Sequence, residues 1–416
     1  MVLPFFPMLR QMSNCKLSNV YPYLCKARRK IGVLLRISLK RSIRKIGMKR
    51  DILKMTYFNS GAKLRLFNLD LHIGVIRDLE QELMNHVNID LVSWSISRHN
   101  GLIRNFLNIP DPVKHVNNKT WSSLNPAIRN EFIIEYSGFL KKFDGFIVTH
   151  TQSFIQLFEC LNKPILLLNA TRYEAPYSND LSQWSSLNES LRKLSESKLL
   201  HIGSNNKGDQ EYLFRNTSIN SFIVPSVCDY LSPSRESESS IGLIFCRSAH
   251  FQNYIERITG GRFKTTYGRY VSYEEIIQAS SIVVVPQNIS TMFLFEMATL
   301  GKRVLIPEIN LLKDLAQKVP GVLSELSYFQ IHGLSTEGLA NDDLNNYASP
   351  VFYDQWLGFA DFYDLNLMPN VELFEDFSEL QHYSSAYIPD QQTNVRRNKS
   401  LRDKRANFVN SFIQKL

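Results

Sequence analysis

A run of apolar residues in the second half of the chain leads into a segment whose residues suit a nucleotide. Val285 ends the run, and Ser290 and Thr291 stand where a helix would begin. Free N–H groups and the helix dipole at such a start favour a diphosphate. Glu296, further along the same helix, has two oxygens that can accept hydrogen bonds from two ribose hydroxyls. The spacing therefore indicates a nucleotide site; the simpler alternative is an ordinary helix cap followed by a solvent-facing glutamate.

A group suited to remove a proton follows the first strand expected in the chain. Asp70 and His72 stand directly after that strand, and His99 follows the next one. An imidazole has a pKa near working pH, so His72 as a general base would supply ~10²–10⁴ in rate. We take His72, with Asp70, as the catalytic candidate and His99 as its rival beside the acceptor. The alternative is that His72 caps the following helix and Asp70 is an ordinary acid at its start.

Two further strand ends carry charged residues. Arg172 and Glu174 follow the apolar run 164–168, and they could either bind acceptor hydroxyls or fold their loop by pairing with each other. Arg247 follows the run 241–246, where a guanidinium could neutralise a leaving diphosphate or simply lie on the surface. Because the sequence holds no Asp-x-Asp motif, we expect no metal site and a metal-independent reaction.

The elements that must position these residues alternate between strand and helix. Short Val/Ile/Leu runs separated by helical patterns are typical of parallel sheets covered by helices on both faces, and ligands of such sheets bind at the carboxyl ends of the strands. The predicted strands are 64–68, 90–94, 145–149, 164–168, 201–204, 221–224, 241–245, 281–285 and 304–306; the predicted helices are 73–84, 153–161, 250–258, 273–279, 291–300 and 401–413.

The rhythm of strands and helices restarts after a polar, Ser-rich stretch at 231–240, which is typical of a linker. We therefore predict an α/β protein with two Rossmann-like domains facing across a cleft, at 61–230 and 241–390, after a basic leader at 1–60. Residues 391–416 are expected to form a C-terminal helix. Its basic residues are interpreted as a solvated face: Arg396, Arg397, Arg402, Lys404 and Arg405.

The nucleotide segment as a whole, from Ser290 to Pro307, reads Ser-Thr-x₄-Glu-x₄-Gly-Lys-x-Val-x-x-Pro and resembles the donor-binding segment of GT-B glycosyltransferases. Arg303 replaces the proline usual at that turn. Blocks across about 62–380 are similar to a loosely characterised group of microbial and viral glycosyltransferases. These blocks are Leu69-Asp-Leu-His72, Asn169-Ala-Thr-Arg-Tyr-Glu174 and Trp356-Leu-Gly-Phe-Ala-Asp-Phe-Tyr363. The resemblance also implies that the last helix packs back on the first domain.

The resemblance implies an enzyme that moves a sugar from a nucleotide-sugar to a hydroxyl of a glycan or lipid-linked acceptor, with no further cofactor. Retaining enzymes pair an Arg with a Lys five residues later, but Gln252 stands five after Arg247, which favours inversion. Three alternatives remain open: a nucleotide-sugar 2-epimerase of the same fold, a non-catalytic nucleotide-sugar-binding scaffold and a DNA-modifying glucosyltransferase. The last requires a basic body, and the charge distribution is the opposite.

The basic character of the chain is confined to its start. Residues 1–50 hold thirteen Lys or Arg and no acid, and the total of +9 leaves −4 for the rest. We therefore do not expect nucleic acid as a partner. Apolar residues recur at helical spacing in 31–46, so residues 26–50 could lie on an anionic membrane surface. A solvated leader, or translation starting at Met48 or Met55, is the alternative.

Neither a membrane-spanning stretch nor a secretion signal is evident in the sequence. The five cysteines are scattered without a C-x-x-C pair, which is typical of reduced thiols. These features predict a cytoplasmic protein, with peripheral contact to the inner face of a membrane as an open alternative.

Overall fold

The structure is a computed structural model that describes residues 63–84, 86, 88–97, 113–177, 180–231, 239–383 and 391–416. Residues 63–416 belong to one compact unit. The basic leader, its proposed membrane-binding stretch 26–50 and the rival base His99 lie outside the described residues, so the structure bears on none of them. No helix among those described is long and apolar enough to cross a bilayer.

The first sheet is built from six parallel strands in the order β2-β1-β3-β4-β5-β6. Strands β3 and β4 carry an almost continuous apolar run, and β3, β4 and β5 are buried along their whole length, as expected for strands covered on both faces. The strands are β1 (Leu64–Asp70), β2 (Ile89–Ser95), β3 (Gly145–Thr149), β4 (Ile165–Asn169), β5 (Leu200–Ser204) and β6 (Phe222–Ile223).

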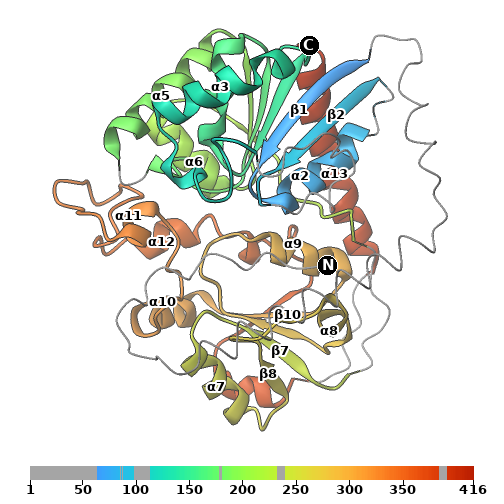
Figure 1. The fold of residues 1–416 in the computed structure, drawn as a ribbon. Helices are drawn as coiled ribbons and strands as arrows, with labels where there is room; N and C mark the ends of the chain where they lie inside the picture. The colour runs from blue at the N-terminus through green and yellow to red at the C-terminus, as the bar shows by residue number, and fades with distance from the viewer. Residues whose placement is uncertain are drawn as a thin grey trace, which may run out of the picture. The chain divides into compact units, whose positions relative to one another are not determined.

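Helices lie between these strands in the chain (Figure 1). The helix predicted over 153–161 is wrong in part: only α4 is a short α-helical turn, and it is flanked by the 3₁₀ turns η4 and η5. The segment ends at Asn162, which adopts a left-handed conformation with φ of 51°. The bounds are η3 (Trp121–Ser123), α2 (Ile73–Met84), α3 (Pro126–Leu140), η4 (Gln152–Phe154), α4 (Ile155–Phe158), η5 (Glu159–Leu161), α5 (Leu181–Glu196) and α6 (Lys207–Thr217).

The second sheet has five parallel strands in the order β11-β10-β9-β7-β8. Its strands are β7 (Gly242–Phe245), β8 (Phe263–Thr265), β9 (Ile282–Val284), β10 (Val304–Pro307) and β11 (Val371–Phe374). Its helical elements are α7 (Ala249–Ile258), α8 (Tyr273–Gln278), α9 (Met292–Leu300), α10 (Ile309–Lys318), α11 (Tyr328–His332), α12 (Phe352–Leu357), η7 (Asp361–Tyr363) and η8 (Phe377–Gln381). The predicted α/β architecture with two Rossmann-like sheets is confirmed.

Each sheet has one point where the strand order changes direction. In the first sheet, β2 lies on one side of β1 and β3 on the other; in the second, β8 and β9 flank β7 in the same way. At such a point the loops that follow two neighbouring strands run to opposite sides of the sheet. The carboxyl ends of these two strands therefore form the usual binding crevice of an open α/β sheet. Ligands are therefore expected at the ends of β1 and β3 and at the ends of β7 and β9.

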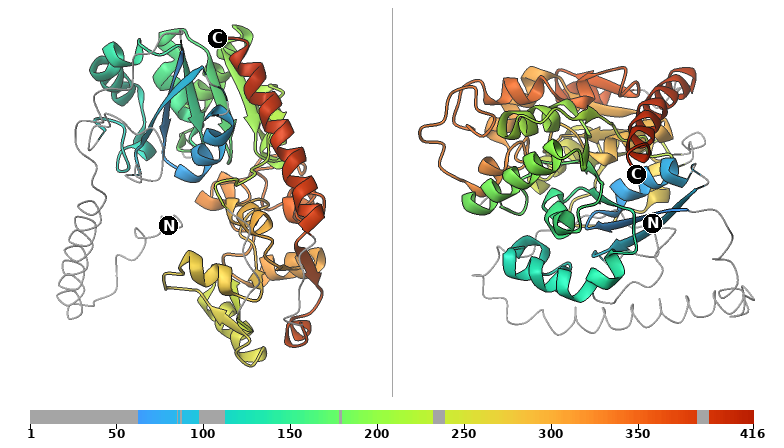
Figure 2. Two further views of the ribbon diagram at one scale, coloured as in Figure 1. Left: turned by 90° about the vertical axis from the view of Figure 1, so that its right-hand side faces the viewer. Right: turned by 90° about the horizontal axis from the view of Figure 1, so that it is seen from above.

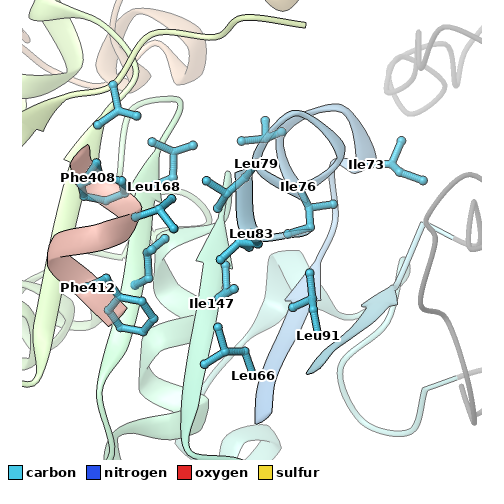
Figure 3. Packing of buried hydrophobic residues seen from close by; sticks show 14 residues of the cluster. Leu66, Ile73, Ile76, Leu79, Leu83, Leu91, Ile147, Leu168, Phe408 and Phe412 are labelled. Carbon is cyan, nitrogen blue, oxygen red and sulfur yellow. The ribbon is translucent and has the colours of Figure 1, made fainter. Parts of the chain in front are cut away.

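The last helix, α13 (Gln391–Ile413), begins where the C-terminal helix was expected, ten residues before the helical pattern at 401–413, and packs into the core of the first sheet. Phe408 and Phe412 lie against side chains from β1, β3, β4 and α2 (Figure 3), and Figure 2 shows α13 as one long helix leading to the C-terminus. A helix that follows the second sheet in sequence thus completes the hydrophobic core of the first.

One face of α13 differs from its prediction. Arg405 is 1% exposed and donates to Asp78 at 2.8 Å and to the Pro225 carbonyl oxygen at 2.7 Å. Arg397 is also buried, whereas Arg396, Arg402 and Lys404 are exposed as expected. Arg402 also forms an ion pair with Asp229. The solvated-face interpretation is therefore wrong for Arg405 and Arg397, because a guanidinium can be buried where acceptors surround it.

Candidate active site

The change of strand direction in the first sheet brings two imidazoles together. His72 follows β1 and His150 follows β3, and their rings stack with centroids 5.1 Å apart and planes inclined by 20°. Both residues are only partly buried by area, so the pair lies at the molecular surface. Sequence analysis selected His72; it could not establish that His150 would stack on it, because β1 and β3 are neighbours only once the sheet has formed.

Asp70 supports the backbone at this point. Its Oδ1 accepts a hydrogen bond from the His72 N–H at 2.6 Å, and its side chain is fully buried. Burial raises the pKa of Asp70 well above its ordinary value, against the lowering effect of the His72 backbone hydrogen bond. A buried acid bonded to the backbone holds the turn that carries His72, so the structure favours a positioning role for Asp70 over direct contact with an acceptor.

The change of strand direction in the second sheet holds Arg247 and the loop after β9. Arg247 pairs with Glu325 through Nη1, and both side chains remain 29% exposed. Gly321 passes close by: a Cβ added there would lie 2.9 Å from the Arg247 Cβ, and its φ of 92° also favours glycine. The remaining guanidinium donors of Arg247 therefore lie at the edge where a ligand is expected.

Helix α9 begins at this edge without the predicted side-chain cap. Thr291 occupies the N-cap position with extended backbone, but it makes no capping hydrogen bond within the described chain. The Leu294 N–H donates to the Thr291 carbonyl oxygen at 3.1 Å, which leaves the N–H groups of Met292 and Phe293 to another acceptor. Ser290 lies beside Asp361 of η7, whose backbone N–H donates to the Ile289 carbonyl oxygen at 3.1 Å. Burial raises the pKa of Asp361 to about 7, against the lowering effect of the Ser290 hydroxyl.

Glu296 is more enclosed than a solvent-facing residue would be. It is 8% exposed, and Oε1 accepts a hydrogen bond from the Tyr230 hydroxyl at 2.6 Å. Oε2 has no hydrogen-bond partner among the described residues. Burial raises the pKa of Glu296, and the Tyr230 hydrogen bond opposes that effect. One carboxylate oxygen is thus committed to the protein, and the other is left for a further donor.

The two edges meet at the first turn of α2. A Cβ added to Gly74 would lie 3.2 Å from Cε1 of His72 and 3.8 Å from Cε of Met292, the first residue of α9. Met292 also receives a contact from the Ser226 hydroxyl at 2.9 Å from its sulfur. The candidate base and the open start of the nucleotide helix therefore lie on either side of Gly74.

Arg172 and Glu174 lie away from this point, inside the protein. Arg172 is 2% exposed, pairs with Asp209 at 3.1 Å and donates to Asn288 Oδ1 at 3.1 Å. Glu174 is fully buried, and its Oε1 lies 2.6 Å from the Tyr212 hydroxyl oxygen. The two residues do not fold the loop by pairing with each other, and their burial favours a role in joining the two sheets over acceptor binding.

Several residues of the site were not selected from the sequence. His150 and Asp361 carry ionisable groups at strand or loop ends, with His150 partly exposed and Asp361 buried, and Tyr230 precedes the predicted linker. Only their position after a strand or inside a matching block could have drawn attention to them. Within the described part of the chain, no cluster of three or more His, Cys, Asp or Glu side chains has the geometry to hold a metal ion.

No family model and no curated protein sequence matches the chain. Among solved structures, it is similar to a glycotransferase of kitacinnamycin at 8% identity and a TM-score of 0.39, covering 84% of this chain and 96% of that one. It is also similar to the spinosyn forosaminyltransferase SpnP, at 10% identity and a TM-score of 0.42, covering 85% of this chain and 98% of that one. A UDP-N-acetylglucosamine 2-epimerase is similar at 12% identity and a TM-score of 0.38, covering 59% of this chain and 79% of that one.

The chain has a GT-B-type fold. That statement rests on the two parallel sheets, each with one change of strand direction, and on the final helix that returns to the first sheet. The likenesses to solved structures are too distant to identify a substrate.

Proposed function

We propose that the protein is a glycosyltransferase that moves a sugar from a nucleotide-sugar to an acceptor hydroxyl without a metal ion. The observation that carries the proposal is the meeting of His72 and Met292 at Gly74. It places a potential base next to a helix start that is open to a diphosphate. An acceptor hydroxyl activated on the first sheet would then face an anomeric carbon held on the second.

The donor side of the proposal rests on α9 and its surroundings. The N–H groups of Met292 and Phe293 would bind the diphosphate, and Arg247 would neutralise charge as the diphosphate leaves. The free oxygen of Glu296 would accept a hydrogen bond from the nucleotide ribose. With Tyr230 holding the other oxygen, Glu296 has room for one ribose hydroxyl directly, not the two suggested by its sequence position.

The acceptor side rests on His72. During transfer the acceptor O–H bond breaks as its proton passes to His72, the oxygen forms a bond to the anomeric carbon, and the bond from that carbon to the diphosphate breaks. Its electron pair leaves with the nucleotide. We propose a glycan or lipid-linked acceptor in polysaccharide biosynthesis, and a cytoplasmic location with residues 26–50 touching an anionic membrane.

A nucleotide-sugar 2-epimerase of the same fold is the alternative. An epimerase would use the same donor site but need no acceptor. A non-catalytic nucleotide-sugar-binding scaffold is separated from both by the absence of turnover. Analysis of the products distinguishes the three.

The donor site is tested by thermal melting of the full chain with UDP, GDP, CMP, ADP and dTDP in parallel. A nucleotide present at ~100 times its Kd adds about 2.7 kcal/mol, which appears as a rise of a few degrees in Tm. Glu296→Gln should lose most of the shift while keeping the fold, because the amide preserves the shape of the side chain. Glu274→Gln, at an exposed position of α8, is the matched control and should keep the shift. If no nucleotide shifts the wild-type protein, the donor site is refuted.

A further inference from the structure

His150 has a backbone conformation that is unusual for a residue other than glycine. It is the first residue after β3, it has a left-handed backbone with φ of 60°, and its N–H lies 3.3 Å from the Leu168 carbonyl oxygen of β4. Residues other than glycine are uncommon in this region, and histidine is among those found there more often than most. Such conformations cluster at functional sites, where the surrounding structure holds them. The conformation turns the chain at the edge where a ligand is expected.

The ring of His150 is held at one face and at its edge. One face stacks on His72, with centroids 5.1 Å apart. At the edge, Nδ1 lies 3.2 Å from the Thr151 hydroxyl oxygen, which gives the ring a fixed orientation. His72 in turn is anchored through its backbone N–H to Asp70. The two imidazoles thus form a pair with one member on each strand of the change of direction.

His150 stays uncharged over the working pH range. Burial, followed by the repulsion of His72, lowers the pKa of His150 to about 3. His150 faces the titratable ring of His72, and the buried Asp70 bonds the His72 backbone. A neutral ring against His72 does not add a positive charge when His72 accepts a proton. It therefore serves as a rigid wall and does not compete for that proton.

We propose that His150 is the positioning residue for His72: its ring, fixed by β3 and Thr151, holds the His72 imidazole in the plane from which it removes the acceptor proton. The inference rests on the proposed function for its chemistry, but the stack itself is independent of it. Orientation matters because a base displaced by about 1 Å loses on the order of 10²-fold in rate.

Two substitutions separate the ring from the backbone. His150→Asn removes the ring and tolerates the left-handed conformation, so the turn should survive. His150→Phe keeps a flat ring and removes both nitrogens. We expect His150→Asn to lower kcat by about 10- to 100-fold with the donor KM within about twofold, and His150→Phe to recover most of the rate. A purely structural residue would change stability or KM instead and would not be rescued by a ring.

A second readout needs no substrate. A stacked aromatic ring shifts the NMR signals of the carbon-bound protons of its neighbour, and the His72 signals are identified by their loss in His72→Asn. They should move in His150→Asn and stay near their wild-type positions in His150→Phe. Unmoved signals in His150→Asn, an unchanged kcat in that variant, or a His150→Phe as slow as His150→Asn would each overturn the proposal. If the wild-type protein transfers no sugar, the proposed function and the proton-transfer role fall, while the NMR comparison still decides whether the stack exists.

Discussion

The two sheets touch in two regions of opposite character. Where β4 and β5 end, Arg172, Asp209 and Glu174 are buried in a polar network that reaches Asn288 of the second sheet. Where β1 and β3 end, His72 and His150 remain partly exposed beside the start of α9. The first region encloses its charges: Arg172 pairs with Asp209, while Oε2 of Glu174 has no hydrogen-bond partner among the described residues. The second region leaves a base and N–H groups of a helix start near solvent.

The difference in burial indicates that the first region stabilises the structure and that the second region binds ligands and reacts. A buried ion pair with further hydrogen bonds tolerates little movement, because loss of any partner leaves a charge without compensation. Groups that must meet a ligand need access and unused hydrogen-bonding capacity. The Tyr212 hydroxyl oxygen, 2.8 Å from Asn345 Oδ1, and the Trp356 ring, 4.9 Å from the Arg172 guanidinium carbon, extend the first region across the two sheets. We therefore expect the network to fix the sheets and the imidazole region to bind and react.

The largest effect should come from breaking the network. Arg172→Met leaves Asp209 buried without its cation, and the free energy of unfolding should fall by about 3–5 kcal/mol in a urea titration. Arg192→Met is the matched control, since Arg192 pairs with Glu189 at the surface, and it should change stability by less than about 1 kcal/mol. Equal small losses in both variants would show that the network does not hold the sheets.

The next effect is a pH dependence of stability due to Glu174. Burial raises its pKa from 4.5 to about 7, despite the Tyr212 hydrogen bond that lowers it. Between these values the native state holds a proton that the unfolded chain has released, so stability falls as pH rises through this window. Relative to wild type, Glu174→Gln should gain about 3 kcal/mol between pH 4 and pH 8. A difference that stays constant with pH would contradict the assignment.

The smallest expected effect on stability concerns the start of α9, in the second of the two regions. Thr291→Asp supplies the missing cap of α9 and should add about 0.5–1 kcal/mol to the free energy of unfolding. The same carboxylate would occupy the proposed diphosphate site, so the nucleotide-induced rise in Tm should disappear. Asn125→Asp, which adds a charge at the capped start of α3, is the control and should leave the nucleotide shift intact. A more stable Thr291→Asp that still binds nucleotide would move the donor site elsewhere.

Much of the fold was predictable because strand and helix periods are local. The bounds of α2 and β3 agree with the sequence to the residue, and a helix does begin after Thr291 at a change of strand direction. Partners across the fold were not predictable. The Thr291 side chain did not cap, Arg172 found Asp209 in preference to Glu174, and His150 came to stack on His72. Each of these contacts depends on which strands become neighbours in the sheet, and a local sequence pattern does not carry that information.

The central claim is tested most directly by following one nucleotide-sugar, chosen by the nucleotide that gives the largest rise in Tm, with mass spectrometry of the products. Wild-type protein should release nucleoside diphosphate and free or transferred sugar with no 2-epimer. His72→Asn should slow that release by ~10²–10⁴-fold, while His99→Asn, at the rival position, should leave it near wild type. Epimerised nucleotide-sugar, no release with any sugar, or an unaffected His72→Asn would contradict the account.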